Sequence, residues 1–382
     1  MKIIERIIKY PFRFIPLLVS VLVLAFSLSE VSNARLAVEI EEQIRRIESL
    51  EQSYLNGEIA PVDRNAFFNG DLQAELDAGL KFNELRYTAT HNSYQTESVD
   101  ELKQIYRKLS DLTFGLVPEN MADFVSPTLT DQLNSGIYSL EIDIEVFDRD
   151  GDISFTCMHN PRFQMTTSCY DFALAMREIA MWSDNNPNHL PITLIIEPKE
   201  SFLPLEDMKV LNLDYAKELD KTLRATLGDR LFTPADMLRE YESFGEMRRA
   251  NDWCKVKDML GKVLILFHEC NTTEGYIDLD PTIKSQAMFP MLREKDMERD
   301  CASFLLLNRP VKEFKAIEKA ISLGLIVRTR ADEFTDVTEE KREKAFESGA
   351  QIMSTDYPVR QGLTADDYVV CFGDMKTISI NK

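Results

Sequence analysis

Residues 138–147 alternate apolar with acidic side chains, and this pattern constrains the fold of the chain most strongly. An alternation of period two is typical of a β-strand. One face of that strand would carry the aliphatic residues Leu140, Ile142, Ile144 and Val146, and the other would carry Glu141, Asp143 and Glu145. Three carboxylates on one face repel one another, so a bound divalent cation such as Ca²⁺ or Mg²⁺ would stabilise them. A solvated edge strand with an acidic outer face is the alternative interpretation.

Other short apolar runs alternate with segments of helical period. The predicted strands are Leu85–Thr90, Ile137–Phe147, Ser154–Met158, Pro191–Glu197, Lys262–Phe267, Ser303–Leu307, Leu325–Arg328 and Ala350–Ser354. The predicted helices include residues 171–184, 207–227, 310–322 and 338–348. Continuous apolar strands such as 192–196 suit a parallel sheet that is buried on both faces. We therefore predict an α/β fold, a single (β/α)8 TIM-type barrel. A doubly wound open sheet is the alternative, although no glycine-rich phosphate loop follows these strands.

The formal net charge of −20 narrows the classes of partner. Such a surface disfavours nucleic acid, whose phosphates require Lys and Arg, and it disfavours broad docking on anionic membranes. An anionic substrate must therefore be met by local cations or by a bound metal.

The N-terminus has the pattern of an export signal. Four basic residues, the last of them Arg13, precede residues 14–29, which carry no charge. We predict that residues 1–34 are a signal peptide cleaved after Ala34, or else an uncleaved membrane anchor. Either interpretation predicts an exported protein, periplasmic or secreted and in the second case anchored by residues 14–29.

The rest of the chain divides into three predicted parts. Residues 35–80 form a helical extension, because residues 36–55 place apolar side chains at helical spacing. Residues 81–362 form the catalytic barrel, and residues 363–382 form a C-terminal tail.

Six cysteines favour disulfide formation in an exported chain. Cys157 and Cys169 are the favoured pair, and buried free thiols are the alternative.

Polar residues follow the predicted strands at their carboxyl ends, where barrels build active sites. They are His91, Asn92, Glu141, Asp143, His159, Glu197, Lys199, Arg328 and Arg330. Two of the four histidines thus lie beside carboxylates, which favours acid–base catalysis. His189 is interpreted as structural, and His268 is a secondary candidate.

Four of these side chains, Asn92, Glu141, Asp143 and Glu197, offer only oxygen ligands, which favours Ca²⁺ or Mg²⁺ over Zn²⁺. The acidic run 148–152 lacks EF-hand spacing and is interpreted as a tight turn.

Several short motifs resemble those of phosphoinositide-specific phospholipase C of the X-domain type. They are Ala89–Tyr94, Glu141–Asp143, His159–Pro161, Ile195–Lys199 and Ile352–Pro358. Together with Val327–Asp332, the chain resembles the microbial, calcium-dependent branch of that superfamily over about residues 82–360. The resemblance implies a (β/α)8 barrel and a calcium-dependent phosphodiesterase. The substrate would be a phospholipid or another phosphodiester, met transiently at a membrane surface.

The resemblance also implies residue roles. Asn92, Glu141, Asp143 and Glu197 correspond to calcium ligands, His91 and His159 to the catalytic pair, and Lys199, Arg328 and Arg330 to phosphate or inositol contacts. The inositol 2-hydroxyl would attack the phosphodiester and release diacylglycerol and a (cyclic) inositol phosphate. Glu141 or another ligand carboxylate would accept the proton, His91 would stabilise the phosphoryl oxygens, and His159 would protonate the leaving group.

Two rival functions stay open. One is a hydrolase of the glycerophosphodiester phosphodiesterase type, and the other is a calcium-stabilised binding protein without catalysis.

Overall fold

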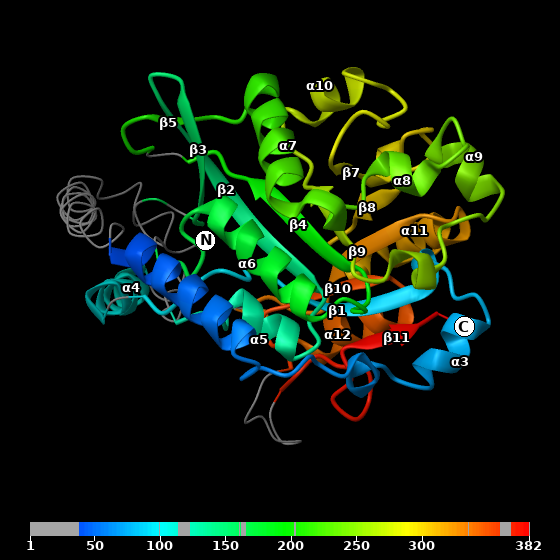
Figure 1. Ribbon diagram of the computed structural model, residues 1–382, viewed down its shortest axis with the longest axis horizontal. Helices are drawn as coiled ribbons and strands as arrows, with labels where there is room; N and C mark the ends of the chain where they lie inside the picture. Colours follow the sequence, from blue (N-terminus) through cyan, green and yellow to red (C-terminus); the bar gives the residue numbers. More distant parts are fainter. Residues whose placement is uncertain are drawn as a thin grey trace.

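Eight parallel strands form the barrel that the sequence predicts, in the order β1-β10-β9-β8-β7-β6-β4-β2 (Figure 1). They are β1 (Leu85–Thr90), β2 (Ser139–Arg149), β4 (Ile192–Pro198), β6 (Val263–Phe267), β7 (Phe289–Leu292), β8 (Phe304–Leu306), β9 (Ile326–Arg330) and β10 (Ile352–Thr355). β2 meets the end of β1 through Ser93. The Ser93 N–H donates to the Glu141 carbonyl at 2.8 Å, and the Glu141 N–H donates to Ser93 Oγ at 2.8 Å. The predicted α/β TIM-type fold is confirmed.

This structure is a computed structural model that describes residues 38–98, 100–113, 123–159, 161, 166–201, 204–334, 336–359 and 368–381. The predicted signal peptide or anchor, its cleavage site after Ala34, and residues 363–367 of the predicted tail lie outside the described residues. Within those ranges, no helix combines the length and apolarity that a bilayer crossing needs.

Two strand predictions need correction. The predicted strand at 154–158 is β3 (Asp152–Cys157), which forms an antiparallel hairpin with β2 and lies outside the barrel. The fifth barrel strand, β7, was missed, because Pro290 interrupts a short apolar run and a proline argues against a central strand. The β2–β3 turn has positive φ at Asp150 (53°) and Gly151 (93°), as a two-residue hairpin turn requires. The predicted tight turn at 148–152 is therefore confirmed.

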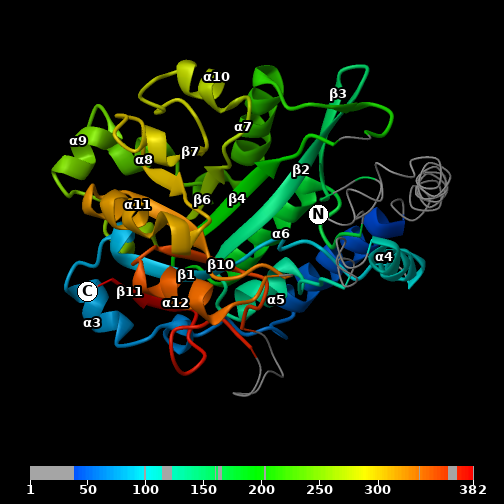
Figure 2. The ribbon, with the colours of Figure 1, turned by 180° about the vertical axis from the view of Figure 1, so that it is seen from behind.

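Helices cover the outside of the barrel, so the strands are buried on both faces (Figures 1 and 2). All five residues of β6 are buried, as are the first five of β4. The predicted helices appear as α6 (Phe172–Asn185), α7 (Leu213–Leu227), α11 (Pro310–Ser322) and α12 (Glu339–Glu347). α7 starts later than predicted, because residues 208–209 form β5 against β2, and the Asn212 side chain then caps the helix.

Shorter elements complete the fold. They are α3 (Leu72–Asp77), α4 (Asp100–Thr113), α5 (Leu129–Asn134), α8 (Pro234–Leu238), α9 (Phe244–Arg249), α10 (Thr273–Asp278) and β11 (Ile378–Ile380).

Residues 38–55 form a helix that is fastened to α6 and to the segment that precedes it. The Gln43 side chain bonds both backbone groups of Asp171, at 2.9 and 3.0 Å. Arg46 donates to the Ser168 carbonyl and to Glu178 Oε2, each at 2.7 Å. Glu178 is fully buried, and its other oxygen accepts from the Thr130 N–H and hydroxyl. The extension is thus held to the barrel layer by an ion pair whose carboxylate is buried.

Arg46→Ala should lower the free energy of unfolding by about 3 kcal/mol, because it leaves the buried Glu178 carboxylate without its cation. Arg45→Ala is the matched control, since Arg45 forms only an exposed pair with Glu41 and should change stability by less than about 0.5 kcal/mol. Urea unfolding followed by circular dichroism measures both. Equal free energies of unfolding for Arg46→Ala and Arg45→Ala would contradict a stabilising role of the Arg46–Glu178 pair.

All six cysteines are free thiols, so the predicted Cys157–Cys169 disulfide is wrong for this structure. Both side chains are fully buried within the hydrophobic core. Burial raises the pKa of the Cys169 thiol to about 12, which keeps it unreactive.

Candidate active site

The barrel mouth collects the residues that the sequence predicts for the site. His91 and Asn92 follow β1, Glu141 and Asp143 lie on β2, and His159 follows the β2–β3 hairpin. Glu197 lies on β4 opposite Asp143 in the strand register. Lys199 follows β4, while Arg328 and Arg330 end β9.

Oxygen atoms converge at one point of this mouth. One carboxylate oxygen each of Glu141, Asp143 and Glu197 can be chosen so that all three lie within 4.8 Å of one another. Glu141 Oε1, Asp143 Oδ1 and Asn92 Oδ1 are buried and have no hydrogen-bond partner. A buried oxygen without a partner is costly, and a hard cation satisfies several of them together. The four side chains therefore fit Ca²⁺ or Mg²⁺.

Asn92 takes an unusual backbone conformation to join this group. Its φ is +47°, in the left-handed region that asparagine tolerates better than most residues.

Arg328 holds Glu141 in place. Its guanidinium donates to Glu141 Oε2, to Ser354 Oγ at 3.0 Å and to Asn308 Oδ1, and the residue is 1% exposed. Burial acts to raise the pKa of Glu141, but the neighbouring basic groups, Arg328 first among them, together outweigh it and lower this pKa. Arg328 therefore holds Glu141 in this structure, and its expected role as a phosphate or inositol contact stays a prediction.

Asp143 is the centre of a second network. Its Oδ2 accepts from the Tyr94 hydroxyl at 2.8 Å, from His159 Nδ1 at 2.7 Å and from Lys199 Nζ at 3.0 Å. Lys199 Nζ also lies 2.8 Å from Glu197 Oε1. Burial opposes ionisation of Asp143, but Lys199 and His159 more than offset it and lower the pKa of this carboxyl. Lys199 thus balances two of the three carboxylates.

His91 is held from both sides. Its Nδ1 lies 2.8 Å from Asp356 Oδ1, and its Nε2 lies 2.9 Å from the Arg330 guanidinium. A guanidinium only donates, so Nε2 is the acceptor and the ring proton resides on Nδ1. Asp356 is itself fixed by the Phe334 N–H at 2.6 Å.

His159 is likewise oriented by a carboxylate. Its Nδ1 lies 2.7 Å from Asp143 Oδ2, and 33% of its side chain is exposed at the mouth. The two histidines therefore share a carboxylate partner at Nδ1, and His91 differs in that Arg330 also holds its Nε2.

The other two histidines differ from each other. His189 is buried, with its ring nitrogens on Ser183 Oγ (2.8 Å) and the Leu190 carbonyl (2.6 Å), and burial lowers its pKa to about 4. These contacts agree with a structural residue. His268 lies at the mouth, with Nε2 3.9 Å from Glu197 Oε2.

Glu145, the third acidic residue of β2, stands apart from the oxygen cluster. It accepts from the Ser201 hydroxyl, and burial raises its pKa to about 7.

Sequence reasoning missed four residues that support the site: Tyr94, Asn308, Ser354 and Asp356. Tyr94, Ser354 and Asp356 lie inside the short motifs, which marked their neighbourhood without showing their contacts. Asn308 carries no such signal, because its bond to Arg328 joins two different strand ends.

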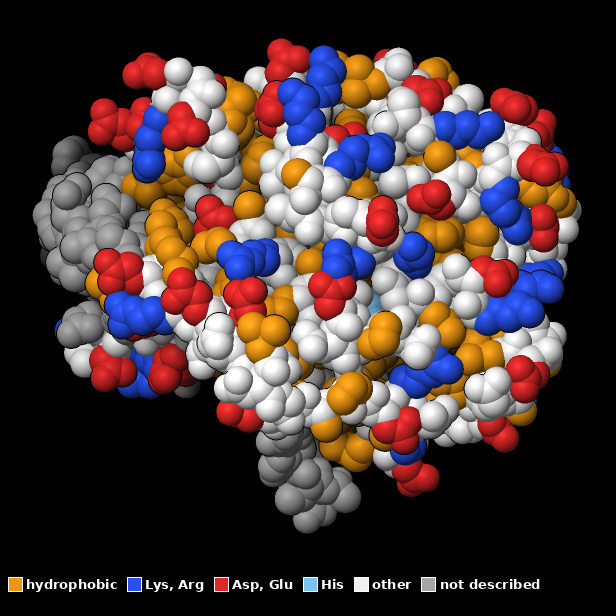
Figure 3. All heavy atoms as spheres, viewed as in Figure 1, with side chains coloured by type: hydrophobic (Ala, Val, Ile, Leu, Met, Phe, Trp, Pro, Cys, Tyr) orange, Lys and Arg blue, Asp and Glu red, His pale blue; other side chains and the backbone are white. Residues whose placement is uncertain are grey.

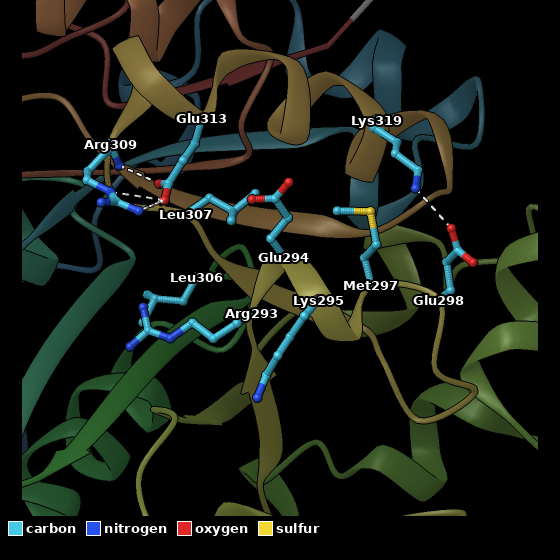
Figure 4. A pocket seen from close by; sticks show the side chains of 10 residues that line it. All are labelled: Arg293, Glu294, Lys295, Met297, Glu298, Leu306, Leu307, Arg309, Glu313 and Lys319. Atoms are coloured by element: carbon cyan, nitrogen blue, oxygen red, sulfur yellow. Dashed lines mark hydrogen bonds and ion pairs between the residues drawn. The ribbon is translucent and has the colours of Figure 1, made fainter.

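A groove of about 710 Å³ lies between the segment after β7 and α11, and it contains none of the predicted site residues (Figure 4). Two of its four cations pair with carboxylates that also line it: Arg309 pairs with Glu313, and Lys319 pairs with Glu298.

Comparisons with known proteins identify the family and support the fold. Residues 152–382 match the family model described as phosphoinositide phospholipase C, Ca²⁺-dependent. A solved calcium-dependent phosphoinositol-specific phospholipase C from a Gram-negative Pseudomonas species has 16% identity and a TM-score of 0.56, covering 84% of this chain and 100% of its own. A Ca²⁺-dependent phosphatidylinositol-specific phospholipase C from Streptomyces antibioticus has 17% identity and a TM-score of 0.51, covering 72% and 95%. No curated protein sequence matches the chain. At these identities the two structures support the fold alone.

Proposed function

Since the chain belongs to the family of Ca²⁺-dependent phosphoinositide phospholipases C, we propose that its mouth cleaves phosphatidylinositol-type lipids to diacylglycerol and a (cyclic) inositol phosphate. The family consists of phosphoric diester hydrolases, so the chain is an enzyme of that class. The observation that supports the proposal most strongly is the convergence of carboxylate oxygens from Glu141, Asp143 and Glu197 beside two oriented histidines.

Asn92, Glu141, Asp143 and Glu197 would hold the calcium ion. When bound, Ca²⁺ lowers the pKa of the attacking hydroxyl and offsets charge on a phosphoryl oxygen. Lys199 and Arg328 hold the ligand carboxylates in place, and both are already bound to them. Because these two cations offset the carboxylate charges, they also weaken the repulsion between the carboxylates and an approaching anionic phosphodiester.

Glu141 suits the role of ligand better than that of base, because the basic groups around it, Arg328 first, hold its pKa below the ordinary value. His91 Nε2 would accept the proton of the inositol 2-hydroxyl once Arg330, which now donates to it, turns to the substrate. Asp356 orients this ring, and the proton that His91 gains is stabilised by the same carboxylate. Arg330, the donor to Nε2, is the proposed contact for a phosphoryl oxygen.

His159 is the proposed general acid. Asp143 orients its ring, 33% of the side chain is exposed at the mouth, and Nε2 would protonate the departing diacylglycerol oxygen. The proton lost from the 2-hydroxyl and the proton given to the leaving group thus pass through different histidines.

Turnover of a phosphodiester panel tests this function. We expect hydrolysis of phosphatidylinositol with Ca²⁺, release of a cyclic inositol phosphate, and loss of activity with a chelator. Release of glycerol phosphate from glycerophosphodiesters would favour the rival hydrolase. Calcium binding without any turnover would favour the non-catalytic protein.

A further inference from the structure

Tyr94 is a completely buried residue in the loop that carries His91 and Asn92. The Gln95 N–H donates to the Asn92 carbonyl at 3.1 Å and closes a turn in this loop. The turn brings Tyr94 against β2, where its hydroxyl lies 2.8 Å from Asp143 Oδ2. An ionised carboxylate only accepts hydrogen bonds, so the hydroxyl is the donor. The same short loop therefore supplies one proposed metal ligand and a hydrogen bond to another.

Ser168 fixes the backbone of Tyr94. The N–H and the hydroxyl of Ser168 donate to the Tyr94 carbonyl at 2.8 and 3.2 Å. The Ser168 carbonyl in turn accepts from Arg46 of the N-terminal helix at 2.7 Å. The ring of Tyr94 packs within the hydrophobic core. Both the backbone and the ring are thus held, which leaves the hydroxyl little freedom to move.

The other two donors to Asp143 Oδ2 are held less firmly. The side chain of His159 is 33% exposed, and that of Lys199 is 18% exposed. Lys199 also bonds Glu197 Oε1 at 2.8 Å, so its charge is shared between two carboxylates. Tyr94 is the fully buried member of the three donors. The orientation of the Asp143 carboxylate therefore depends most on Tyr94.

The two oxygens of Asp143 have different surroundings. Oδ2 has its three donors, whereas Oδ1 is buried and has no hydrogen-bond partner among the described residues. Glu141 shows the same division, with Oε2 bonded to Arg328 and Oε1 without a partner in the described part of the chain. A carboxylate that is fixed through one oxygen can offer only the other to a cation. Such outer hydrogen bonds orient metal ligands and tune the affinity of the site.

We propose that Tyr94 is a positioning residue of the calcium site, whose hydroxyl holds Asp143 Oδ2 and so keeps Oδ1 available for the ion. The inference rests on the ligand set of the proposed function, but it concerns calcium affinity rather than turnover. Loss of an outer-shell partner of this kind typically weakens metal binding by 10–100-fold.

Tyr94→Phe tests the proposal, because it removes the hydroxyl and keeps the buried ring. Tyr276→Phe is the matched control. Tyr276 is also completely buried, and its hydroxyl donates to Asp220 Oδ1 at 2.7 Å, but Asp220 is not one of the clustered carboxylates. Each variant loses one buried hydrogen bond to a carboxylate, so both should unfold at a somewhat lower temperature in chelator.

Calorimetric titration of Ca²⁺ into the metal-free proteins measures the affinity without any substrate. The dissociation constant of Tyr94→Phe should rise by at least about tenfold, whereas that of Tyr276→Phe should equal the natural value. Acidic side chains are spread over the face in Figure 3, and the net charge is −20, so weak surface binding of Ca²⁺ is expected in all three proteins. Titration at high salt screens this background and leaves the buried site.

The calcium dependence of turnover gives a second measurement. Tyr94→Phe should need more Ca²⁺ for half-maximal hydrolysis of phosphatidylinositol, and saturating Ca²⁺ should restore most of the rate, since His91 and His159 are unchanged. Ser168→Ala is a milder variant, because it removes one of the two bonds to the Tyr94 carbonyl. It should raise the calcium dissociation constant by a smaller factor.

Equal calcium dissociation constants for Tyr94→Phe and the natural protein would overturn the proposal. An equal rise in Tyr94→Phe and Tyr276→Phe would also overturn it, because the effect would then be one of general stability. If the natural protein bound calcium normally but did not cleave phosphatidylinositol, the proposed function would fail while the affinity comparison would still test Tyr94. Absence of calcium binding by the natural protein would contradict the proposed ligand set and this inference together.

Discussion

The His159→Ala variant is expected to lose turnover by a factor on the order of 10²–10⁴, while its calcium affinity stays nearly unchanged. His159 bonds Asp143 through Nδ1, and Tyr94 and Lys199 still hold that carboxylate when the ring is removed. The lost group is the proposed proton donor to the leaving oxygen. Steady-state rates and calorimetric calcium titrations measure the two quantities separately.

A substrate with an activated phenolic leaving group should restore part of the His159→Ala loss. A phenolate needs less protonation than an alkoxide to depart, so the missing acid matters less. His189→Gln is a poor control, because His189 is buried in the fold. The informative comparison is a variant of a proposed metal ligand, such as Glu197→Gln. If the activated ester restored the rates of His159→Ala and Glu197→Gln equally, the assignment of His159 would be contradicted.

Glu197→Gln should raise the calcium concentration for half-maximal activity by at least about tenfold, because it removes one of three ligand charges. Among the proposed ligands, Glu197 is the one whose substitution disturbs buried ion pairs least. Its side chain is 21% exposed and pairs with Lys199. Glu141→Gln would in addition leave the buried Arg328 without its anion, at a cost of about 3–5 kcal/mol of stability.

Glu200→Gln is the matched control for Glu197→Gln. Glu200 is exposed and bonds Asn271 at 2.6 Å, outside the oxygen cluster. The calcium dependence of the Glu200→Gln variant should equal that of the natural protein. The phenolic ester should restore little of the Glu197→Gln loss at low calcium. An unchanged calcium dependence of Glu197→Gln, or full activity in chelator, would refute the proposed ligand set.

Local patterns in the sequence determined which residues reach the mouth. A period of two on residues 138–147 predicts that Glu141 and Asp143 share a face, and strand register does place Asp143 beside Glu197. Polar residues directly after apolar strands meet at one end of any parallel barrel, so His91 and Asn92 were also recognisable. The same reasoning failed for β3 and β7, because short strands with a hairpin turn or a proline give a weak local signal.

Only the tertiary structure decided how these residues act on one another. Arg328 lies 187 positions from Glu141, and Asp356 lies 265 positions from His91. Periodicity reports the face of a single element, whereas such contacts depend on how separate strands pack and on which charges are buried together. Burial then sets the surroundings of each group: it pairs Arg328 with Glu141, and it leaves the side-chain oxygens of Asn92, Glu141 and Asp143 without a protein partner. The sequence therefore determined which residues lie at the mouth, and the packing of the barrel decided their contacts.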